Sequence, residues 1–591
     1  MATKFTYPDD SFSAVPITHP DGGSVTVASG AYIFGTAGFL LDPGTWTVKM
    51  DGTIRVDNNG IIFKSNIGGD PVGTSHLSVG AEGTIVTTDS GGTGVSIGMP
   101  VDIKNSGLIV GGQYGISAST FGPTASKGFA ITNTESGVIF GSVAIHDSSS
   151  SLAMTVKNQG VINGLTASIE WAGAVNITNS GDILGGLHPL NPASTLAAVI
   201  TNSGLIFGAM DFADGNDMLK NTGEISGAVD LGDGINQMTS SGLVDGVITF
   251  GAGNDTLTNT GTIEDPVHFL GGNNKLTNGG TISGAIDFGS GNDSVVNTKS
   301  IIGNVTFGDG NNSLTNSGTI SGSVLGGSAT DVFKSTGTFG SIDLGDGDDT
   351  FVGGNKGEIV SDAFGNDTYK LGGGDDTLVL FAGNDTCDGG AGTDTVSLSI
   401  VNAAYFINLD SKAVVLNSQP LQASSFSTTG ITTSVKNFES AVANSGNDII
   451  AGNSAANSLT GFNGNDTLYG GLGADNLSGG LGNDTFVYFQ TKESGLTKAT
   501  RDTISDFFGV GIGGGDQIDL SAIDANTKVA GNQAFTWTNT NTQFGNIAGE
   551  LRAVFQANNT IIQGDVNGDG KADFAITVIG TQFLAAADFV P

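Results

Sequence analysis

The sequence predicts an all-β protein: a parallel β-solenoid with 19-residue coils, followed by shorter glycine- and aspartate-rich repeats and a β-rich C-terminal module. Three observations favour this class. Glycine occupies 96 of the 591 positions, short β-prone runs are broken by Gly-Asn and Gly-Asp turns, and two regular periods run through the chain. A solenoid accounts for all three, because successive repeats stack and bury their apolar residues together.

The chain is strongly acidic, and this limits its partners. Aspartate and glutamate outnumber lysine and arginine 57 to 21, which gives a net charge of -36. Such a surface repels phosphate backbones and anionic membranes and attracts cations. We therefore expect no nucleic-acid partner.

Cysteine content and hydropathy restrict the remaining classes. Cys387 is the single cysteine, so no intrachain disulfide is expected. No apolar run is long enough to span a bilayer, and "MATKFTYPDDSFSAVP" lacks the pattern of a secretory signal. Cytoplasmic residence and export without an N-terminal signal both stay open at this point.

Two segments precede the regular repeats. Residues 1–104 are glycine-rich and β-prone, and we assign them only as a β-rich N-terminal region. In residues 105–210 the pattern Asn-x-Gly recurs without a fixed period, at Asn105, Asn158, Asn179 and Asn202. We interpret this segment as solenoid coils of irregular length.

Residues 211–343 repeat every 19 residues, as in "TFGAGNDTLTNTGTIEDPV" and "TFGDGNNSLTNSGTISGSV". Apolar residues recur at four places in each repeat, and we expect each set to stack inside the solenoid. The four predicted columns are Phe212, Leu231, Phe250, Phe269, Phe288 and Phe307; Leu219, Met238, Leu257, Leu276, Val295 and Leu314; Ile225, Val244, Ile263, Ile282, Ile301 and Ile320; and Val229, Ile248, Val267, Ile286, Val305 and Val324.

Polar residues repeat with the same period. Asn221, Asn259, Asn278, Asn297 and Asn316 share one position, where stacked amides can hydrogen-bond between coils. At the turn, acid alternates with amide: Asp217, Asn236, Asp255, Asn274, Asp293 and Asn312. Coils lie about 4.8 Å apart, where adjacent carboxylates would repel each other. Because half of these positions are uncharged, we interpret the turn column as structural rather than metal-binding.

A nine-residue period follows in two arrays, residues 344–397 and 443–487, separated by an insert at 398–442. Typical copies are "LGGGDDTLV", "GGLGADNLS" and "GGLGNDTFV". This Gly-Gly-x-Gly-x-Asp-x-apolar-x pattern resembles the hemolysin-type calcium-binding repeat of RTX (repeats-in-toxin) proteins. The resemblance implies parallel β-rolls in which two nonapeptides make one coil, so that every second repeat shares an edge.

The expected metal ligands follow from that arrangement. Undiluted carboxylates on one edge should repel unless a cation is bound, and calcium takes six or more oxygen ligands. The predicted calcium ligands of the arrays are Asp349, Asp367, Asp376, Asp385, Asp394, Asp448, Asp466, Asp475 and Asp484. Glu358 and Asn457 depart from the repeat. Cys387 occupies the inward apolar position, and we interpret it as a small buried hydrophobe.

Residues 488–591 form the last predicted domain. The chain from Gly461 to Pro591 is similar to the C-terminal module of serralysin-type secreted proteases, and it includes "DVNGDGKADF". There Asp565, Asn567, Asp569 and Asp573 have the spacing of a calcium loop. The loop lacks flanking helices and the late glutamate, so a simple Asx-rich hairpin is the alternative.

The same resemblance implies type I export through a channel that reads an uncleaved C-terminal signal. Asp588, Phe589 and Val590 match that signal, whereas Pro591 departs from it. Scarce cytosolic calcium would leave the arrays unfolded, and calcium outside would fold them. We therefore expect a secreted protein, extracellular or at the cell surface.

No catalytic motif is found. None of His19, His76, His146, His188 and His268 begins the His-Glu-x-x-His of zinc proteases. We predict a non-enzymatic structural or adhesive protein of surface-layer or biofilm type. Its candidate partners are other copies of the same chain, in a self-assembled layer, or a cell-surface polysaccharide. The alternative is a carbohydrate-active β-helix enzyme, a polysaccharide lyase or epimerase carrying RTX repeats.

Overall fold

The computed structural model confirms the all-β class. It describes residues 3–7, 12–13, 17–19, 22–64, 74–119, 128–150, 153–398, 404–428, 431–509, 515–580 and 583–591. Among these residues the one helical element is a 3₁₀ turn, η1 (Ala586–Asp588). The chain forms two compact units: unit 1 is Met1–Asp309 with Gly318–Gly322, and unit 2 is Gly310–Ser317 with Ser323–Pro591.

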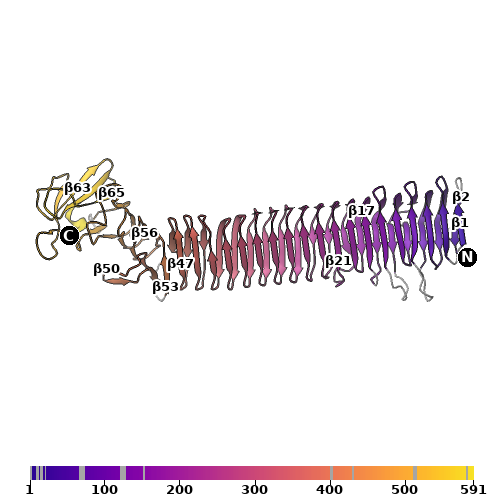
Figure 1. Cartoon of the computed structure of the whole chain (residues 1–591), viewed down its shortest axis with the longest axis horizontal. Helices are drawn as coiled ribbons and strands as arrows, with labels where there is room; N and C mark the ends of the chain where they lie inside the picture. Colours follow the sequence, from indigo (N-terminus) through magenta and orange to yellow (C-terminus); the bar gives the residue numbers. More distant parts are fainter. Residues whose placement is uncertain are drawn as a thin grey trace. The chain divides into compact units, whose positions relative to one another are not determined.

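In unit 1 a regular coil consists of three short strands, and corresponding strands of successive coils pair in parallel (Figure 1). One coil contains β30 (Thr256–Asn259), β31 (Thr262–Ile263) and β32 (Val267–Gly271). The next coil contains β33 (Lys275–Asn278), β34 (Thr281–Ile282) and β35 (Ile286–Ser290). Leu257 pairs with Leu276, a step of 19 residues. The predicted 19-residue coil is therefore confirmed.

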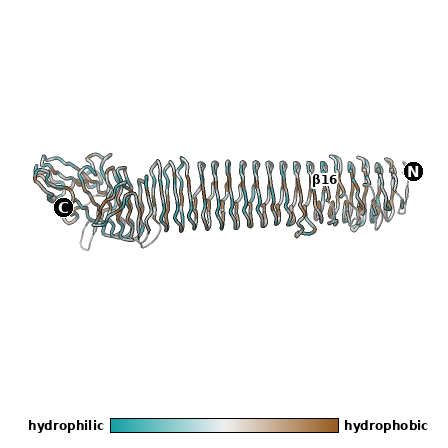
Figure 2. Tube along the Cα trace, turned by 60° about the horizontal axis from the view of Figure 1, so that its bottom comes forward, coloured by the Kyte–Doolittle hydropathy of each residue, from teal (hydrophilic) through white to brown (hydrophobic). Residues whose placement is uncertain are grey.

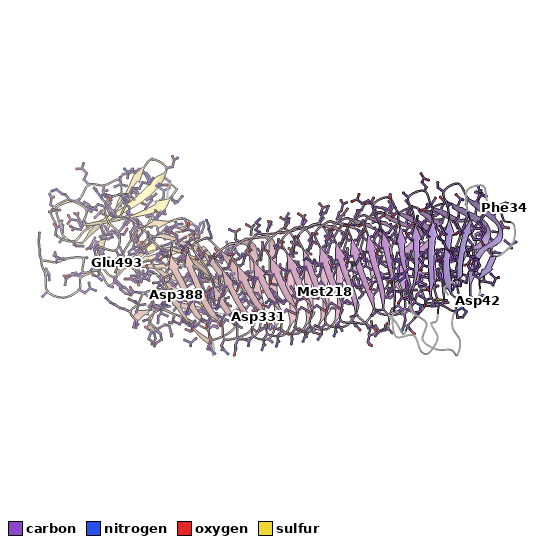
Figure 3. All side chains as sticks on the ribbon, turned by 45° about the vertical axis from the view of Figure 1, so that its right-hand side comes forward. Phe34, Asp42, Met218, Asp331, Asp388 and Glu493 are labelled. Atoms are coloured by element: carbon purple, nitrogen blue, oxygen red, sulfur yellow. The ribbon has the colours of Figure 1, made fainter. Side chains whose placement is uncertain are left out.

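The four predicted apolar columns are buried, and each of their residues is at most 4% exposed. Hydrophobic and hydrophilic residues alternate along the coils (Figure 2), as Met218 and Leu219 illustrate. Met218, labelled in Figure 3, is 45% exposed, whereas Leu219 is 0% exposed. Phe250 and Phe269 stack with ring centroids 4.6 Å apart, and Phe269 and Phe288 with 4.7 Å. Burying one such side chain stabilises the fold by roughly 1.5–3 kcal/mol.

The less regular N-terminal part of the chain forms coils of the same kind. β4 (Gly23–Val27), β6 (Trp46–Met50), β8 (Ser75–Val79) and β11 (Val101–Asn105) pair in parallel in that order. On the opposite side, long strands such as β15 (Val138–Asp147) and β17 (Val161–Trp171) pair with a bulge. The described strands before residue 105, which the sequence left without a fold, are thus part of the solenoid.

A ladder of buried asparagines links these coils. Asn158 Nδ2 donates to Asn179 Oδ1 at 2.8 Å and also to the carbonyls of Gly160 and Asp182. The same bond joins Asn105 to Asn133 and Asn278 to Asn297. Its sequence separation varies between 28 and 19 residues, so coil length changes in the outer loops while this corner stays aligned. The predicted amide ladder is confirmed and begins as early as Asn105.

Unit 2 contains coils of 18 residues. On one face β43 (Thr350–Val352), β45 (Thr368–Gly373) and β47 (Thr386–Ala391) pair in parallel. On the other face β44 (Ile359–Ser361), β46 (Thr377–Leu380) and β48 (Thr395–Leu398) do the same. Two nonapeptides therefore make one coil, with two strands instead of three.

The second array repeats this arrangement. One face contains β55 (Ile449–Ala451), β57 (Thr467–Tyr469) and β59 (Thr485–Val487). The other contains β56 (Ser458–Asn463) and β58 (Asn476–Leu481), which continue from β54 (Ser440–Val442) at the end of the insert. The insert between the arrays joins them, because β54 pairs with both β48 and β56. Its strand β53 (Ile431–Lys436) pairs with β47.

The chain after the second array adds to both faces before it forms an antiparallel sheet. β60 (Thr503–Ile504) pairs with β58, and β61 (Gln517–Asp519) with β59. β63 (Glu550–Gln556), β64 (Asn559–Asp565) and β65 (Phe574–Ile579) are antiparallel, and β66 (Phe589–Val590) lies parallel to β61. No helix in the described residues has the length and apolarity needed to cross a bilayer.

Candidate metal-binding ladders

The aspartates of the first array lie in two ladders, one at each turn of the coil. At the first turn the backbone N–H of Asp349 donates to Asp367 Oδ1 at 2.6 Å, and that of Asp367 donates to Asp385 Oδ1 at 3.0 Å. At the second turn Glu358 N–H donates to Asp376 Oδ1 at 2.8 Å, and Asp376 N–H to Asp394 Oδ1 at 3.0 Å. Each carboxylate therefore reaches back to the preceding coil.

The second array has the same geometry. Asp448 N–H donates to Asp466 Oδ1 at 2.7 Å and Asp466 N–H to Asp484 Oδ1 at 2.8 Å. On the other turn Asn457 N–H donates to Asp475 Oδ1 at 2.8 Å. The structure thus groups the candidate ligands of both arrays by alternate repeats, as the two-nonapeptide coil requires.

The second oxygen of most of these carboxylates has no hydrogen-bond partner although it is buried; Asp385 Oδ2 is an exception, because it accepts from Thr433 Oγ1 at 3.2 Å. The oxygens without a partner are Oδ2 of Asp349, Asp367, Asp376, Asp394, Asp448, Asp466, Asp475 and Asp484. The side chains themselves are at most 2% exposed. An unpaired buried charge is costly, so each carboxylate needs either a proton or a cation.

Burial raises the pKa of most of these groups. The pKa of Asp349 rises to about 7 and that of Asp367 to about 8; desolvation is the main cause, and neighbouring carboxylates raise the values further. In the second array desolvation raises the pKa of Asp466 and Asp475 to about 7. The carboxylates with the highest pKa values, such as Asp367, would therefore hold a proton near neutral pH unless a cation replaces it.

Sequence reasoning missed several members of the ladders. Asp331 N–H donates to Asp349 Oδ1, Asp475 N–H donates to Asp502 Oδ1, and Asp484 N–H donates to Asp516 Oδ1. All three residues sit in an Asp-x-apolar pattern, "DVF", "DTI" and "DQI", which could have identified them without the glycines. In the insert, Thr433 and Glu439 take the aspartate place by accepting N–H bonds from Asp385 and Asp394.

The residues that depart from the repeat also lie in the ladders. Glu358 is 3% exposed with neither carboxylate oxygen bonded, and burial raises its pKa to about 8. Asn457 instead satisfies its amide by donating to the Glu439 carbonyl. Cys387 is fully buried, and burial raises the pKa of its thiol, in accord with its interpretation as a small core residue.

The donor set fits calcium. Carboxylate oxygens that lack partners lie in glycine-rich turns whose backbone carbonyls are further oxygen donors, and calcium prefers such hard ligands in flexible numbers. Glycine is required here: Gly464 has φ of +147°, and a Cβ on it would lie 1.4 Å from the Gly446 carbonyl oxygen of the preceding coil. Calcium would therefore be bound by the unpaired Oδ2 atoms and carbonyl oxygens of a turn in which only glycine fits.

The loop after β64 is arranged differently. Asp565 accepts N–H bonds from Gly568 and Gly570 through its two oxygens, at 2.6 and 2.8 Å. Asp573 accepts from the Val566 N–H and the Asn567 side chain, whereas Asp569 accepts from the Lys571 N–H. The structure brings Asp565, Asn567 and Asp573 together, but hydrogen bonds within the loop already use their carboxylate oxygens.

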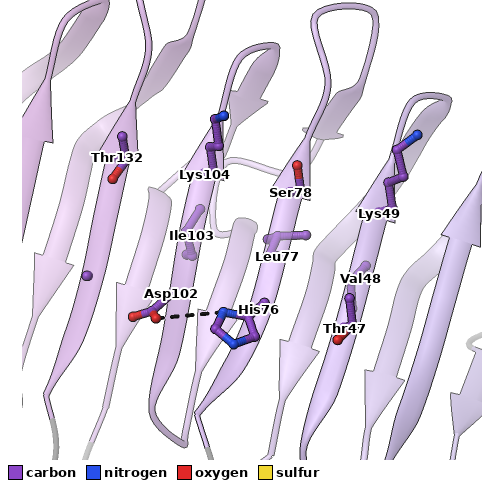
Figure 4. A pocket seen from close by; sticks show the side chains of 11 residues that line it. Thr47, Val48, Lys49, His76, Leu77, Ser78, Asp102, Ile103, Lys104 and Thr132 are labelled. Atoms are coloured by element: carbon purple, nitrogen blue, oxygen red, sulfur yellow. Dashed lines mark ion pairs between the residues drawn. The ribbon is translucent and has the colours of Figure 1, made fainter.

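A separate groove of about 490 Å³ lies on unit 1, across strands β6, β8, β11 and β14 (Phe129–Asn133). Lys49 and Lys104 line it, together with His76, whose Nδ1 lies 3.7 Å from Asp102 Oδ2 (Figure 4). Strand register places Lys49, Ser78, Lys104, Thr132 and Lys157 in one column. Lysines therefore recur at every second coil, about 9.6 Å apart from the strand spacing.

Three histidines that look scattered in the sequence share another column of unit 1. His146 pairs with Glu170 at 2.8 Å, His188 with Asp211 at 2.6 Å and His268 with Asp287 at 3.0 Å. Glu170 is in register with both His146 and His188. Asp147, by contrast, points inward and is 0% exposed. Coils of unequal length hide this alignment from any fixed sequence period.

The fold and the two ladders define the class of protein: a parallel β-solenoid whose 18-residue coils stack carboxylates at both turns. A family model described as Peptidase M10 serralysin C terminal matches residues 375–591. This match covers the later part of the first array, the insert, the second array and the C-terminal sheet. A search of curated proteins found no match. The solenoid and the family match together fit an RTX-like protein.

Proposed function

We propose that this chain is an exported, hemolysin-type RTX protein whose 18-residue coils bind calcium and fold when they do so. The observation that carries the proposal is the double ladder of buried carboxylates in which Oδ2 has no partner. The predicted ligands are the array aspartates, from Asp349 to Asp484, with Asp331, Asp502 and Asp516 as additional members. The "DVNGDGKADF" loop is a weaker candidate because its carboxylates already accept N–H bonds.

Calcium would displace the protons bound to the ladder carboxylates and would remove the repulsion between neighbouring ionised carboxylates. At a calcium concentration 1,000-fold above Kd, each site contributes about 4 kcal/mol to the stability of the folded unit. The summed contribution of several sites in one unit would exceed the typical free energy of unfolding of a domain. The arrays would then be unfolded where calcium is scarce and ordered where it is abundant.

This switch suits export through a type I secretion apparatus. An unfolded chain can pass through a channel, and the family match to the serralysin C-terminal module supports this route. Outside the cell, calcium would fold the coils and make export irreversible. The protein would therefore function in the extracellular space or at the cell surface.

The experiment uses the full-length protein and hydrogen exchange measured by mass spectrometry. With a chelator we expect rapid exchange in the arrays, residues 344–397 and 443–487, and slow exchange in the regular coils of unit 1. Calcium should slow exchange in the arrays and leave unit 1 unchanged. Magnesium at the same ionic strength is the control for charge screening. Equal protection of the arrays in chelator and in calcium would overturn the proposal.

We further propose a non-catalytic structural or adhesive role, as in surface layers or biofilm matrices. Regular coils that present repeated side chains at a fixed spacing suit lateral self-assembly or contact with a polymer. Electron microscopy of the protein with calcium tests this proposal, since ordered sheets or filaments are the expected result. Monodisperse single molecules at all calcium concentrations would contradict self-assembly.

One observation favours a second candidate function, the binding of an anionic polysaccharide. The lysine column at Lys49, Lys104 and Lys157 offers positive charge at a regular interval on a protein of net charge -36, and a polyanion with repeated carboxylates complements it. Binding of polyuronate should weaken in Lys104→Gln and with added salt, whereas the control Lys275→Gln, on β33 in a different column, should change it less. Release of unsaturated sugar would indicate the lyase alternative.

A further inference from the structure

One residue breaks an apolar column inside the first array. In the coils before and after it, the first position of the nonapeptide is Leu344 and Leu380, and both are buried. Strand register through Asp343, Ser361 and Val379 places Asp362 between them. Asp362 is 1% exposed, and neither of its carboxylate oxygens has a hydrogen-bond partner. A buried, unpaired carboxylate in a leucine column is costly for the fold.

The Asp362 side chain is directed at the first-turn ladder. Position one of a nonapeptide faces the carboxylate at position six: a Cβ added to Gly461 or Gly479 would lie 2.2 Å from Oδ2 of Asp466 or Asp484. At 362 the repeat has a carboxylate instead of a glycine. As a result, one oxygen from each of Asp362, Asp367 and Asp385 lies within 4.8 Å of the others.

A fourth polar group faces the same place. Tyr369 is 0% exposed, and its hydroxyl makes no well-formed hydrogen bond. Burial raises the pKa of this hydroxyl, and the nearby negative charges of Asp362 and Asp367 raise it further. None of the ion pairs formed by the described residues involves the three aspartates, so no lysine or arginine neutralises this cluster.

We propose that Asp362, Asp367 and Asp385 bind one divalent cation inside the coil, with the Tyr369 hydroxyl as a neutral oxygen ligand. All four donors are hard oxygen ligands, which calcium binds at 2.3–2.6 Å, and ligand atoms on opposite sides of such an ion are up to about 5 Å apart. The inference rests on the proposed function in one respect: the site shares Asp367 and Asp385 with the calcium-binding ladder. Asp362 distinguishes it from every other turn of the arrays.

The rival account is that Asp362 and Asp367 share a proton and bind no ion. The two accounts differ for Asp362→Leu, which restores the residue of the neighbouring coils. If the cation site exists, the full-length variant binds one calcium ion fewer than the wild type in equilibrium dialysis, and its arrays are more protected than those of the wild type in chelator. Asp343→Asn, an exposed acid on the adjacent strand β42 (Thr338–Asp346), is the charge-matched control and should keep the wild-type ion count.

Terbium, which replaces calcium and emits when a nearby tyrosine is excited, supplies a second readout. Tyr369→Phe should reduce this sensitised emission while the number of bound ions changes by at most one. An unchanged ion count in Asp362→Leu, with unchanged emission in Tyr369→Phe, would overturn the inference and leave the shared proton. Absence of any calcium binding by the wild type would instead overturn the proposed function itself.

Discussion

The 19-residue and the 18-residue coils build the same turn in two ways, and the difference sets how closely unpaired carboxylate oxygens follow one another. In unit 1 aspartate alternates with asparagine: Asn236 N–H donates to Asp255 Oδ1, and Asp255 N–H donates to Asn274 Oδ1. The amide also donates from Nδ2 to a glycine carbonyl of its own turn, Gly232 for Asn236 and Gly272 for Asn274. Both polar atoms of the asparagine are thus satisfied by the protein.

In the first turns of the unit 2 arrays the same place is occupied by aspartate on successive coils, and a carboxylate has no N–H group that could donate to a glycine carbonyl. Oδ2 of Asp349 or Asp466 then has no partner. Oδ2 of Asp217 and Asp255 in unit 1 also lacks a partner, but asparagine places these carboxylates two coils apart, whereas unit 2 has them on successive coils. The Nδ2 amide of asparagine therefore halves the number of unpaired buried carboxylate oxygens at this turn.

The largest effect should follow from replacing the acids of one turn by amides. In the triple variant Asp448→Asn, Asp466→Asn and Asp484→Asn, each new Nδ2 can donate to a glycine carbonyl as in unit 1. We expect the first turn of the second array to be ordered in chelator and to lose its response to calcium. Hydrogen exchange of residues 443–487 measures this. Disorder of the variant in both conditions would refute the equivalence of the two ladders.

The reverse exchange should make the stability of unit 1 depend on calcium. Asn236→Asp with Asn274→Asp places carboxylates on successive coils, and each leaves one buried acceptor unpaired, at a cost of about 1–3 kcal/mol. We expect the thermal midpoint of unit 1 to fall in chelator and to recover partly with calcium. Asn254→Asp, at an exposed neighbouring turn position, is the control and should change the midpoint little.

Acid should partly substitute for calcium. The folded-state pKa values of Asp448, Asp466, Asp475 and Asp484 are raised from 3.8 to between about 6 and about 7, mainly by desolvation. The folded arrays therefore bind more protons than the unfolded chain between pH 4 and pH 7, and their stability falls as pH rises through this window.

In chelator we accordingly expect slower hydrogen exchange of the arrays at pH 5 than at pH 8, after correction for the intrinsic rate. Each unit of pKa difference corresponds to about 1.4 kcal/mol. With saturating calcium the trend should reverse, because calcium needs the ionised carboxylates. A chelated protein whose arrays gain protection towards pH 8 would contradict the assignment.

The smallest of these effects concerns the asparagine ladder of unit 1. Asn278 accepts from Asn259 and donates to Asn297, Gly280 and Ser300. Asn278→Ala should lower the stability of unit 1 by about 1–3 kcal/mol, independently of calcium and pH. Thr277→Ala on the same strand is the matched control. A calcium-dependent loss in Asn278→Ala would show that the two ladders are coupled.

The sequence by itself determined the coil lengths and the inner columns. Periods of 19 and of twice nine residues recur in register, so Leu257 and Leu276 could be assigned to the core, and Asp349, Asp367 and Asp385 to one turn. Such features are local and repeated, and each repeat supports the assignment of the next. Coils of variable length, as between Asn105 and Asn202, could be recognised only by their Asn-x-Gly corner.

Only the tertiary structure decided which groups meet across coils of unequal length or outside the repeat. His146, His188 and His268 fall in one column because outer loops absorb the differences in length. Thr433, Glu439, Asp502 and Asp516 enter the ladders from segments without glycine periodicity. In the sequence Asp362 stands at a position where other repeats have glycine or leucine. Its proximity to Asp367 and Asp385 depends on the inward direction of its side chain. That direction is set by strand register, which a linear pattern does not contain.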